Sequence, residues 1–256
     1  MSTLKIRNPT MIYLKYLPAL LIMTSQQLVQ ASPVIYVECD NLPPMCSTES
    51  ENPGMVMEIG MEAVRRAGYT PKARILPWKR AMQEVRSRTD AVLVLFSRTP
   101  SRAPLFKWIV ETNSVGFSFI RRDGASPIAD LKTAQAAGRI GIRRGSSVVE
   151  WLERNGVEEE ELETGTMEDL AAMLKYGRIA SVLVLPEIFA PVYASRFGAS
   201  PVVGKVVYED SDWIAGGPAM PASTVKAIAE AVAGMKRDGT IEQIIKRYGS
   251  TRAVAP

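Results

Sequence analysis

From Pro33 onward, short strand-like segments alternate with helix-like segments, and this order limits the possible folds more than any other feature of the chain. Apolar runs with the length of strands lie at 34–37, 72–76, 92–96, 115–120, 139–143 and 179–185. Segments with amphipathic spacing or helix boundary residues lie at 56–67, 77–86, 147–154, 166–177, 187–197 and 223–248. Strands that alternate with helices predict an α/β fold with a mainly parallel sheet and helices on both of its faces.

Polar side chains gather directly after the strand expected at 92–96. This run has the β-branched content of a strand buried on both faces. The next six residues, 97–102, read SRTPSR and include two arginines. Open α/β sheets bind their ligands at the carboxyl ends of the strands. We therefore expect a ligand site beside residues 97–102.

The first 31 residues differ from the rest of the chain. Lys5, Arg7 and Lys15 precede or interrupt an apolar stretch at 11–23, and small residues reach Ala31. This pattern predicts a secretory signal peptide, 1–31, that is cut near Ala31. The alternative is an uncleaved membrane anchor, although the apolar stretch is shorter than the ~20 residues that a span needs.

Charge and composition exclude several functions. Without residues 1–31 the chain has 28 basic and 27 acidic residues, so we expect no nucleic acid partner. The chain has no histidine, which excludes a Ser-His-Asp or Cys-His nucleophile and weakens a zinc site. We expect no cofactor and no metal.

The chain has two cysteines, Cys39 and Cys46, both in the mature part. An even number in an exported protein favours one disulfide, which closes a loop over residues 40–45. The alternatives are two free thiols or half of a metal site.

Seven short motifs follow one another along the mature chain. They are PP at 43–44, GMVMEI at 54–59, DA at 90–91, TPSR at 99–102, IGIRRGS at 140–146, LKYGRI at 174–179 and MKRDGTIEQIIKRY at 235–248. In this order they resemble the bacterial extracellular solute-binding proteins of family 3, the polar amino-acid receptors of ATP-driven importers. The resemblance covers nearly all of the mature chain.

The resemblance implies a periplasmic-binding-protein type II fold, in which two α/β lobes are joined by a hinge of two crossings. We place the crossings near Asn113 and Asp210. Lobe 1 then comprises 33–113 and 211–250, lobe 2 comprises 114–210, and 251–256 form a tail. Two crossings favour a hinge motion that closes the lobes over a ligand.

Within this resemblance, Arg102 falls where family members hold the carboxylate of an amino acid. A planar guanidinium matches a carboxylate bidentately and stays charged at any working pH. Ser97 would donate a hydroxyl or a backbone N–H to the same ligand. The alternative for Arg102 is a surface arginine that follows a turn.

The second candidate group is Arg144, Ser146 and Ser147, where a Gly-Ser turn enters a helix. Unpaired backbone N–H groups at a helix start attract anions, so we expect both lobes to hold one anionic group. The two serines also serve as ordinary N-caps, and both descriptions can apply together.

Three further residues complete the predicted site. Trp78 is an aromatic wall for the cleft or a core residue. Asp40 and Asn41 lie on the loop between the cysteines, where they contact ligand or only shape the turn.

One departure from the family pattern narrows the class of ligand that we expect. Family members carry an aspartate for the ligand's amino group where this chain has Leu185, followed by Pro186 and Glu187. The ammonium partner is therefore lost, unless Glu187 or Glu38 replaces it.

These features predict a periplasmic, monomeric receptor that binds a small anionic or zwitterionic metabolite for the permease of an ABC importer. One alternative is a soluble sensor for a membrane signalling partner. A dehydratase-like enzyme on the same fold is another; it would need Glu38, Asp40, Glu187 or a lysine as general acid or base.

Overall fold

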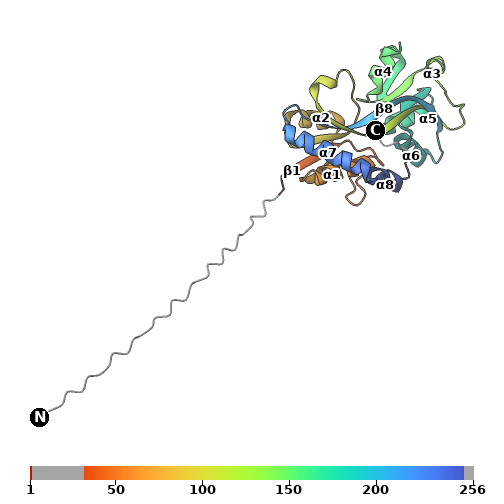
Figure 1. Cartoon of the computed structure of the whole chain (residues 1–256). Helices are drawn as coiled ribbons and strands as arrows, with labels where there is room; N and C mark the ends of the chain where they lie inside the picture. The colour runs from red at the N-terminus through yellow and green to blue at the C-terminus, as the bar shows by residue number, and fades with distance from the viewer. Residues whose placement is uncertain (2–31, 251–256) are drawn as a thin grey trace. The chain divides into compact units, whose positions relative to one another are not determined.

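The computed structural model describes residue 1 and residues 32–250, shown in Figure 1. Apart from Met1, the predicted signal peptide lies outside the described residues, as does the tail 251–256. Among the described residues, no helix is long and apolar enough to cross a membrane.

The described strands form one eight-stranded sheet. Its spatial order is β2 (Thr70–Ile75), β1 (Val34–Cys39), β3 (Ala91–Phe96), β8 (Val202–Gly216), β4 (Lys107–Arg121), β7 (Ser181–Val184), β5 (Ile140–Arg143) and β6 (Leu162–Gly165). Strands β2, β1 and β3 are parallel to one another, and so are β7, β5 and β6. We call these sets the first and the second half of the sheet.

Two long antiparallel strands, β4 and β8, connect the halves. Strand β8 pairs with β3 on one side, and β4 pairs with β7 on the other. The expected mainly parallel sheet is therefore mixed, because these crossings are themselves sheet strands. Asn113 lies opposite Asp212, and Val115 opposite Asp210. The lobe boundaries near Asn113 and Asp210 stay a prediction.

The helices agree with the sequence pattern with a few exceptions. They are α1 (Met55–Arg66), α2 (Trp78–Ser87), α3 (Leu131–Ala137), α4 (Val148–Arg154), α5 (Met167–Lys175), α6 (Pro186–Phe197), α7 (Ala222–Arg237) and α8 (Thr240–Arg247), with short 3-10 turns η1 (Ala103–Leu105) and η2 (Glu159–Glu161).

Helix boundaries follow the capping residues in two cases. At α5, Thr166 and Asp169 form the reciprocal capping box expected from the sequence. Helix α3 begins where the Asp130 side chain accepts from the backbone N–H of Thr133. Helix α7 begins directly after Pro221 without a side-chain cap.

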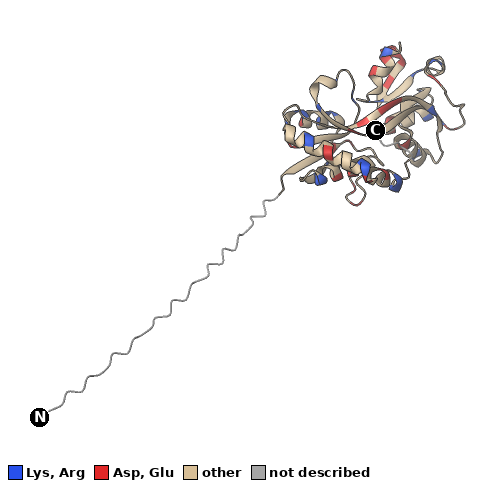
Figure 2. Ribbon diagram, viewed as in Figure 1, with Lys and Arg blue, Asp and Glu red and all other residues tan. Residues whose placement is uncertain are grey.

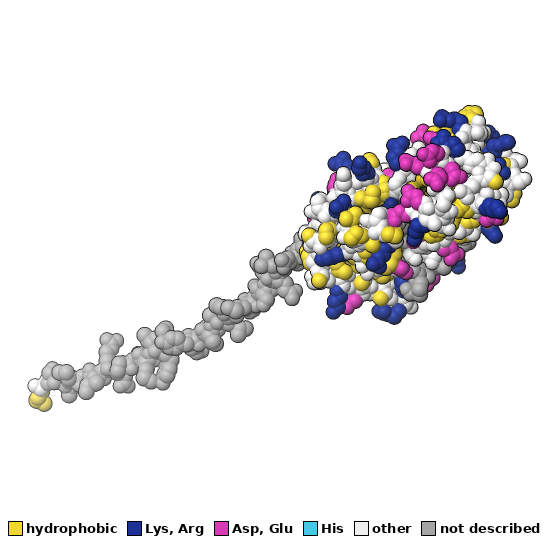
Figure 3. All heavy atoms as spheres, turned by 90° about the horizontal axis from the view of Figure 1, so that it is seen from above, with side chains coloured by type: hydrophobic (Ala, Val, Ile, Leu, Met, Phe, Trp, Pro, Cys, Tyr) yellow, Lys and Arg dark blue, Asp and Glu magenta, His cyan; other side chains and the backbone are white. Residues whose placement is uncertain are grey.

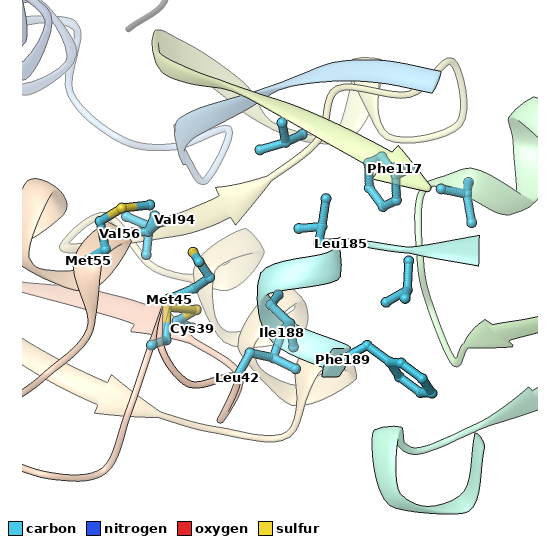
Figure 4. Packing of buried hydrophobic residues seen from close by; sticks show 14 of the residues in the cluster. Cys39, Leu42, Met45, Met55, Val56, Val94, Phe117, Leu185, Ile188 and Phe189 are labelled. Carbon is cyan, nitrogen blue, oxygen red and sulfur yellow. A yellow bond between two sulfur atoms is a disulfide. The ribbon is translucent and has the colours of Figure 1, made fainter. Parts of the chain in front are cut away.

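Strand β3 is buried on both faces, as its apolar sequence predicts. Val92 and Val94 pack into the main core, which includes α1, while Ala91 and Leu93 pack into a second cluster with Trp78 and other residues of α2. The first half of the sheet therefore has helices on both faces. Figure 4 shows part of the main core, including Met55 and Val56 of α1 beside Val94.

A disulfide joins Cys39, at the end of β1, to Cys46, with the Cα atoms 6.3 Å apart. Both cysteines are fully buried, and Leu42 donates a backbone hydrogen bond to Cys46 inside the loop. The pairing replaces the alternatives of free thiols or half of a metal site. No cluster of metal-ligating side chains occurs among the described residues.

Charged side chains of both signs are interspersed over the helices (Figure 2) and over the face drawn in Figure 3. Several form ion pairs on the surface, such as Arg66 with Glu62. This distribution matches the nearly balanced charge of residues 32–256.

Candidate functional site

A cavity lies between the two halves of the sheet, at the carboxyl ends of β3 and β7. Its empty volume is about 490 Å3, counted out to the solvent at its mouth. The polar lining consists of Ser97, Arg102, Arg143, Gly145, Ser146, Ser147 and Asp212. The apolar lining consists of Leu42, Trp78, Leu95, Val115, Phe117, Met167, Val184, Leu185 and Ile188, several of which are labelled in Figure 4. Apolar walls with a few polar groups are typical of small-molecule sites.

Arg102 is positioned by the turn that follows β3. Its backbone N–H donates to the carbonyl of Thr99, and the turn continues into η1. The guanidinium donates to the carbonyl oxygens of Ser97 at 3.3 Å and of Gly145 at 2.8 Å. Burial, opposed by Glu150, lowers the pKa of Arg102 to about 10, which still leaves it charged at neutral pH. The predicted anion partner thus lines the cavity.

A second guanidinium, that of Arg143, was not predicted. Arg143 ends β5, donates to the Asp40 carboxylate at 3.0 Å and lies 5.6 Å from the ring centroid of Trp78. Burial lowers its pKa, and Asp40 opposes that shift. Ligands of open α/β sheets bind at the carboxyl ends of the strands, and this argument, which indicated Ser97, applies equally to Arg143. Arg144, the predicted neighbour, is exposed and is not brought to the cavity.

Three serines line the cavity, and all three were predicted. Ser147 stands at the N-cap position of α4, yet its side chain makes no capping hydrogen bond. The Ser146 hydroxyl accepts only a long hydrogen bond, 3.5 Å, from the backbone N–H of Val148. Ser97 is buried at the end of β3. Neither Ser146 nor Ser147 makes a close capping hydrogen bond, and their contact with a ligand stays a prediction.

Trp78 is both a core residue and a cavity wall. It is 7% exposed and meets Phe96 edge to face at 5.6 Å. Its indole Nε1–H is buried and has no hydrogen-bond partner among the described residues. Buried tryptophan N–H groups usually find an acceptor. Trp78 thus combines a place in the cavity wall with a donor that the described residues leave unsatisfied.

The remaining predicted residues do not line the cavity. The Asp40 side chain pairs with Arg143 and accepts from the backbone N–H of Asn41, which is exposed. Glu187 lies in the first turn of α6. Glu38, the other candidate for an ammonium partner, is fully buried against Arg74 at 2.9 Å. Their assignment to the ligand stays a prediction.

Asp212 was not anticipated, because β8 was not predicted as a strand. It is 2% exposed, and its carboxylate accepts from the side-chain amide of Asn113 at 3.0 Å. The Thr112 hydroxyl donates to its backbone carbonyl at 3.2 Å. The carboxylate that lines the cavity is thus already held by the neighbouring crossing strand.

Glu150 of α4 binds the turn that follows β3. Its carboxylate accepts from the hydroxyls of Thr99 and Ser101 and from the backbone N–H of Ser101 at 3.3 Å. Burial alone would raise the pKa of Glu150, but these hydrogen bonds hold it below its ordinary value. The turn after β3 is therefore tied to the second half of the sheet.

The sequence model of a protein family, the bacterial extracellular solute-binding proteins of family 3, matches residues 34–251. The chain belongs to this family. Membership makes it a solute-binding protein, as the seven motifs predicted. No curated protein sequence matches the chain.

Solved structures share the fold of this family 3 protein at low sequence identity. A histidine kinase sensor domain with similarity to periplasmic binding proteins is 16% identical, with a TM-score of 0.77 over 88% of this chain and 99% of that one. A protein described as an L-cystine ABC transporter of Listeria monocytogenes is 18% identical, with a TM-score of 0.68 over 84% and 95%.

The ancestral amino acid-binding protein AncCDT-1, a precursor of cyclohexadienyl dehydratase, is 14% identical, with a TM-score of 0.68 over 84% of this chain and 94% of that one. These similarities confirm the periplasmic-binding-protein type II fold, with two α/β lobes joined by a two-crossing hinge. They do not identify the ligand.

Proposed function

We propose that this family 3 protein is a periplasmic receptor that captures a small organic anion and delivers it to the permease of an ABC importer. The observation that carries the proposal is the surplus of donors in the cavity. Its lining residues include two arginines, three serines and Trp78, whose indole N–H has no partner among the described residues, against one acidic residue, Asp212. A ligand that supplies acceptors and negative charge satisfies this lining.

The same lining favours a carboxylate without an α-amino group. Leu185 directly follows β7 and lines the cavity, at the position where the family resemblance places the ammonium partner. Glu38 is engaged by Arg74, and the Asp212 carboxylate by Asn113. An ammonium placed in this cavity would find one lining carboxylate, Asp212, which already accepts from Asn113, beside two guanidiniums of its own charge. A zwitterionic amino acid remains the competing ligand class.

Capture would depend on closure of the two proposed lobes, 33–113 with 211–250 and 114–210. Three polar contacts support this division, because each joins segments on opposite sides of the cavity. They are Arg102 with Gly145, Arg143 with Asp40, and Glu150 with the turn at 99–101. A ligand that bridges the same donors would stabilise the closed arrangement.

Isothermal calorimetry with matched ligand pairs tests the proposal. Butyrate and 2-aminobutyrate, or pentanoate and norvaline, differ only in the amino group, and we expect the plain carboxylate to bind more tightly. Arg102→Ala should weaken binding at least ~10-fold, since a hydrogen bond to a charged group contributes ~1.5–3 kcal/mol.

Arg98→Ala is the matched control. Arg98 belongs to the same turn, but it is exposed, lies 5.6 Å from the ring centroid of Trp213 and does not line the cavity. Its substitution should leave binding unchanged. Binding that survives Arg102→Ala at full strength would remove the anion site.

A sensory role is the second candidate, since the similarity to the histidine kinase sensor domain extends over 99% of that domain. The two roles differ in the membrane partner and not in the cavity. Cross-linking in intact cells would distinguish them, because a captured permease supports transport and a captured kinase or cyclase supports sensing. Incubation with prephenate, followed for turnover, tests the dehydratase-like alternative.

A further inference from the structure

Leu95, which lines the cavity, has an unusual backbone conformation. Its φ is +54°, and among the described residues it is the only one other than glycine with a positive φ. In this region the Cβ atom comes too close to the following carbonyl oxygen, so branched residues avoid it. Such a conformation persists only where its surroundings impose it, and it often marks a functional position.

The surroundings impose it through a β-bulge. Leu93 pairs with Ala215 and Phe96 with Trp213. Between these two pairs β3 advances by three residues, whereas β8 advances by two. Leu95 lies within this bulge, which holds one extra residue.

The two cores on either side of β3 fix the bulge. In a regular strand, side chains two residues apart lie on the same face, so Phe96 would point toward the main core as Val94 does. Instead Phe96 packs into the second cluster, stacked on Trp108 at 4.9 Å and edge to face with Phe106 at 4.8 Å. Val94 packs in one core and Phe96 in the other, on opposite faces of the sheet. The backbone between them must therefore change direction at Leu95, which it does through the positive φ.

Glycine adopts a positive φ at little cost and is the usual residue at such a bulge. Because Leu95 is one of the residues that line the cavity, the leucine is better explained by its side chain than by its backbone. We propose that Leu95 sets the size limit of the ligand by filling cavity space that a glycine would leave open. This inference rests on the proposed anion site and adds a specificity-determining residue to it.

Two probe series test the proposal by calorimetry: straight-chain carboxylates from acetate to octanoate, and the matching 2-amino acids. For the unmodified protein, affinity should stop rising at a short chain. For Leu95→Gly it should continue to rise over about two or three more carbons, by about fourfold for each CH2 that becomes buried. Leu95→Ala should shift the optimum less.

Thermal unfolding of the same variants tests the backbone argument. Glycine is ordinarily less stabilising than alanine at a buried position, but here Leu95→Gly should melt at or above Leu95→Ala because it relieves the positive φ. A lower melting temperature for Leu95→Gly would overturn the argument from strain.

The outcomes separate the two proposals. If all three proteins bind with the same optimum chain length, the size limit is not set by Leu95, although the anion site stands. If none of them binds any member of either series, the anion site falls and the size limit with it.

Discussion

Glu38 should make the protein less stable as the pH rises through neutrality. Its carboxyl group is fully buried, and burial raises its pKa from the ordinary 4.5 to about 7. Arg74 and Arg88 oppose this shift, while Glu84 and Asp90 add to it. Arg74 donates to one carboxylate oxygen at 2.9 Å, and the other oxygen is buried without a partner among the described residues.

The sign follows from proton binding. Between pH 4.5 and 7 the folded protein holds a proton on Glu38 that the unfolded chain has released, so raising the pH favours unfolding. The stabilisation is therefore fully present below pH 4.5 and is lost as the pH rises toward 7. A shift from 4.5 to about 7 corresponds to about 3 kcal/mol, most of it lost between pH 5 and 8.

Urea unfolding at a series of pH values between 5 and 8 measures this effect. The free energy of unfolding of the unmodified protein should fall by about 2–3 kcal/mol relative to Glu38→Gln, which does not titrate. Glu84→Gln is the control, because Glu84 is the other carboxylate on Arg74, at 2.7 Å, and its pKa is lowered. A difference between the unmodified protein and Glu38→Gln that stays flat from pH 5 to 8 would refute the argument and show that Arg74 keeps Glu38 ionised.

Two further predictions concern the loop that follows β1. Replacing Cys39 and Cys46 together by serine should lower the free energy of unfolding by about 2 kcal/mol, the value for so short a closed loop, as measured by urea unfolding without reductant; an unchanged value would mean that the disulfide adds no net stability. Asp40→Asn should lower the free energy of unfolding by about 1–2 kcal/mol, because it leaves the partly buried Arg143 without its carboxylate. If a carboxylate from solution can take the place of the Asp40 side chain, 50 mM butyrate should restore more of this stability than 50 mM chloride. Equal effects of the two salts would contradict that exchange.

The sequence predicted the elements of the fold well wherever apolar residues alternate regularly or run together. Strand β3 is an example, since its continuous apolar run requires burial on both faces. It did not predict β8, whose residues 202–213 are mostly half-buried or exposed and include Glu209, Asp210 and Asp212. Such a strand forms because β4 and β3 supply hydrogen bonds on both sides, a cause that lies outside its own residues.

The candidate site was predicted in part for a related reason. Ser97 and Arg102 follow an obvious strand, so the strand-end rule was enough to place them beside the cavity. Choosing between Arg143 and Arg144 required the end of β5, because Arg143 is its last residue and partly buried, whereas Arg144 lies in the exposed turn that follows. The bulge at Leu95 depends on two packed cores and has no signal within its own segment.

The two guanidiniums of the cavity differ in what they already bind, and this gives them different roles. Arg102 donates to a neutral acceptor, the carbonyl oxygen of Gly145, whereas Arg143 donates to a charged one, the carboxylate of Asp40. Both bonds have an ionised donor, but the bond to Asp40 adds the attraction between two opposite full charges, which the carbonyl of Gly145 lacks. A ligand carboxylate therefore gains more by displacing the carbonyl at Arg102 than by exchanging places with Asp40. We therefore expect Arg102 to supply most of the binding energy of the proposed anion, while Arg143 keeps Asp40 and holds the loop after β1 to the end of β5.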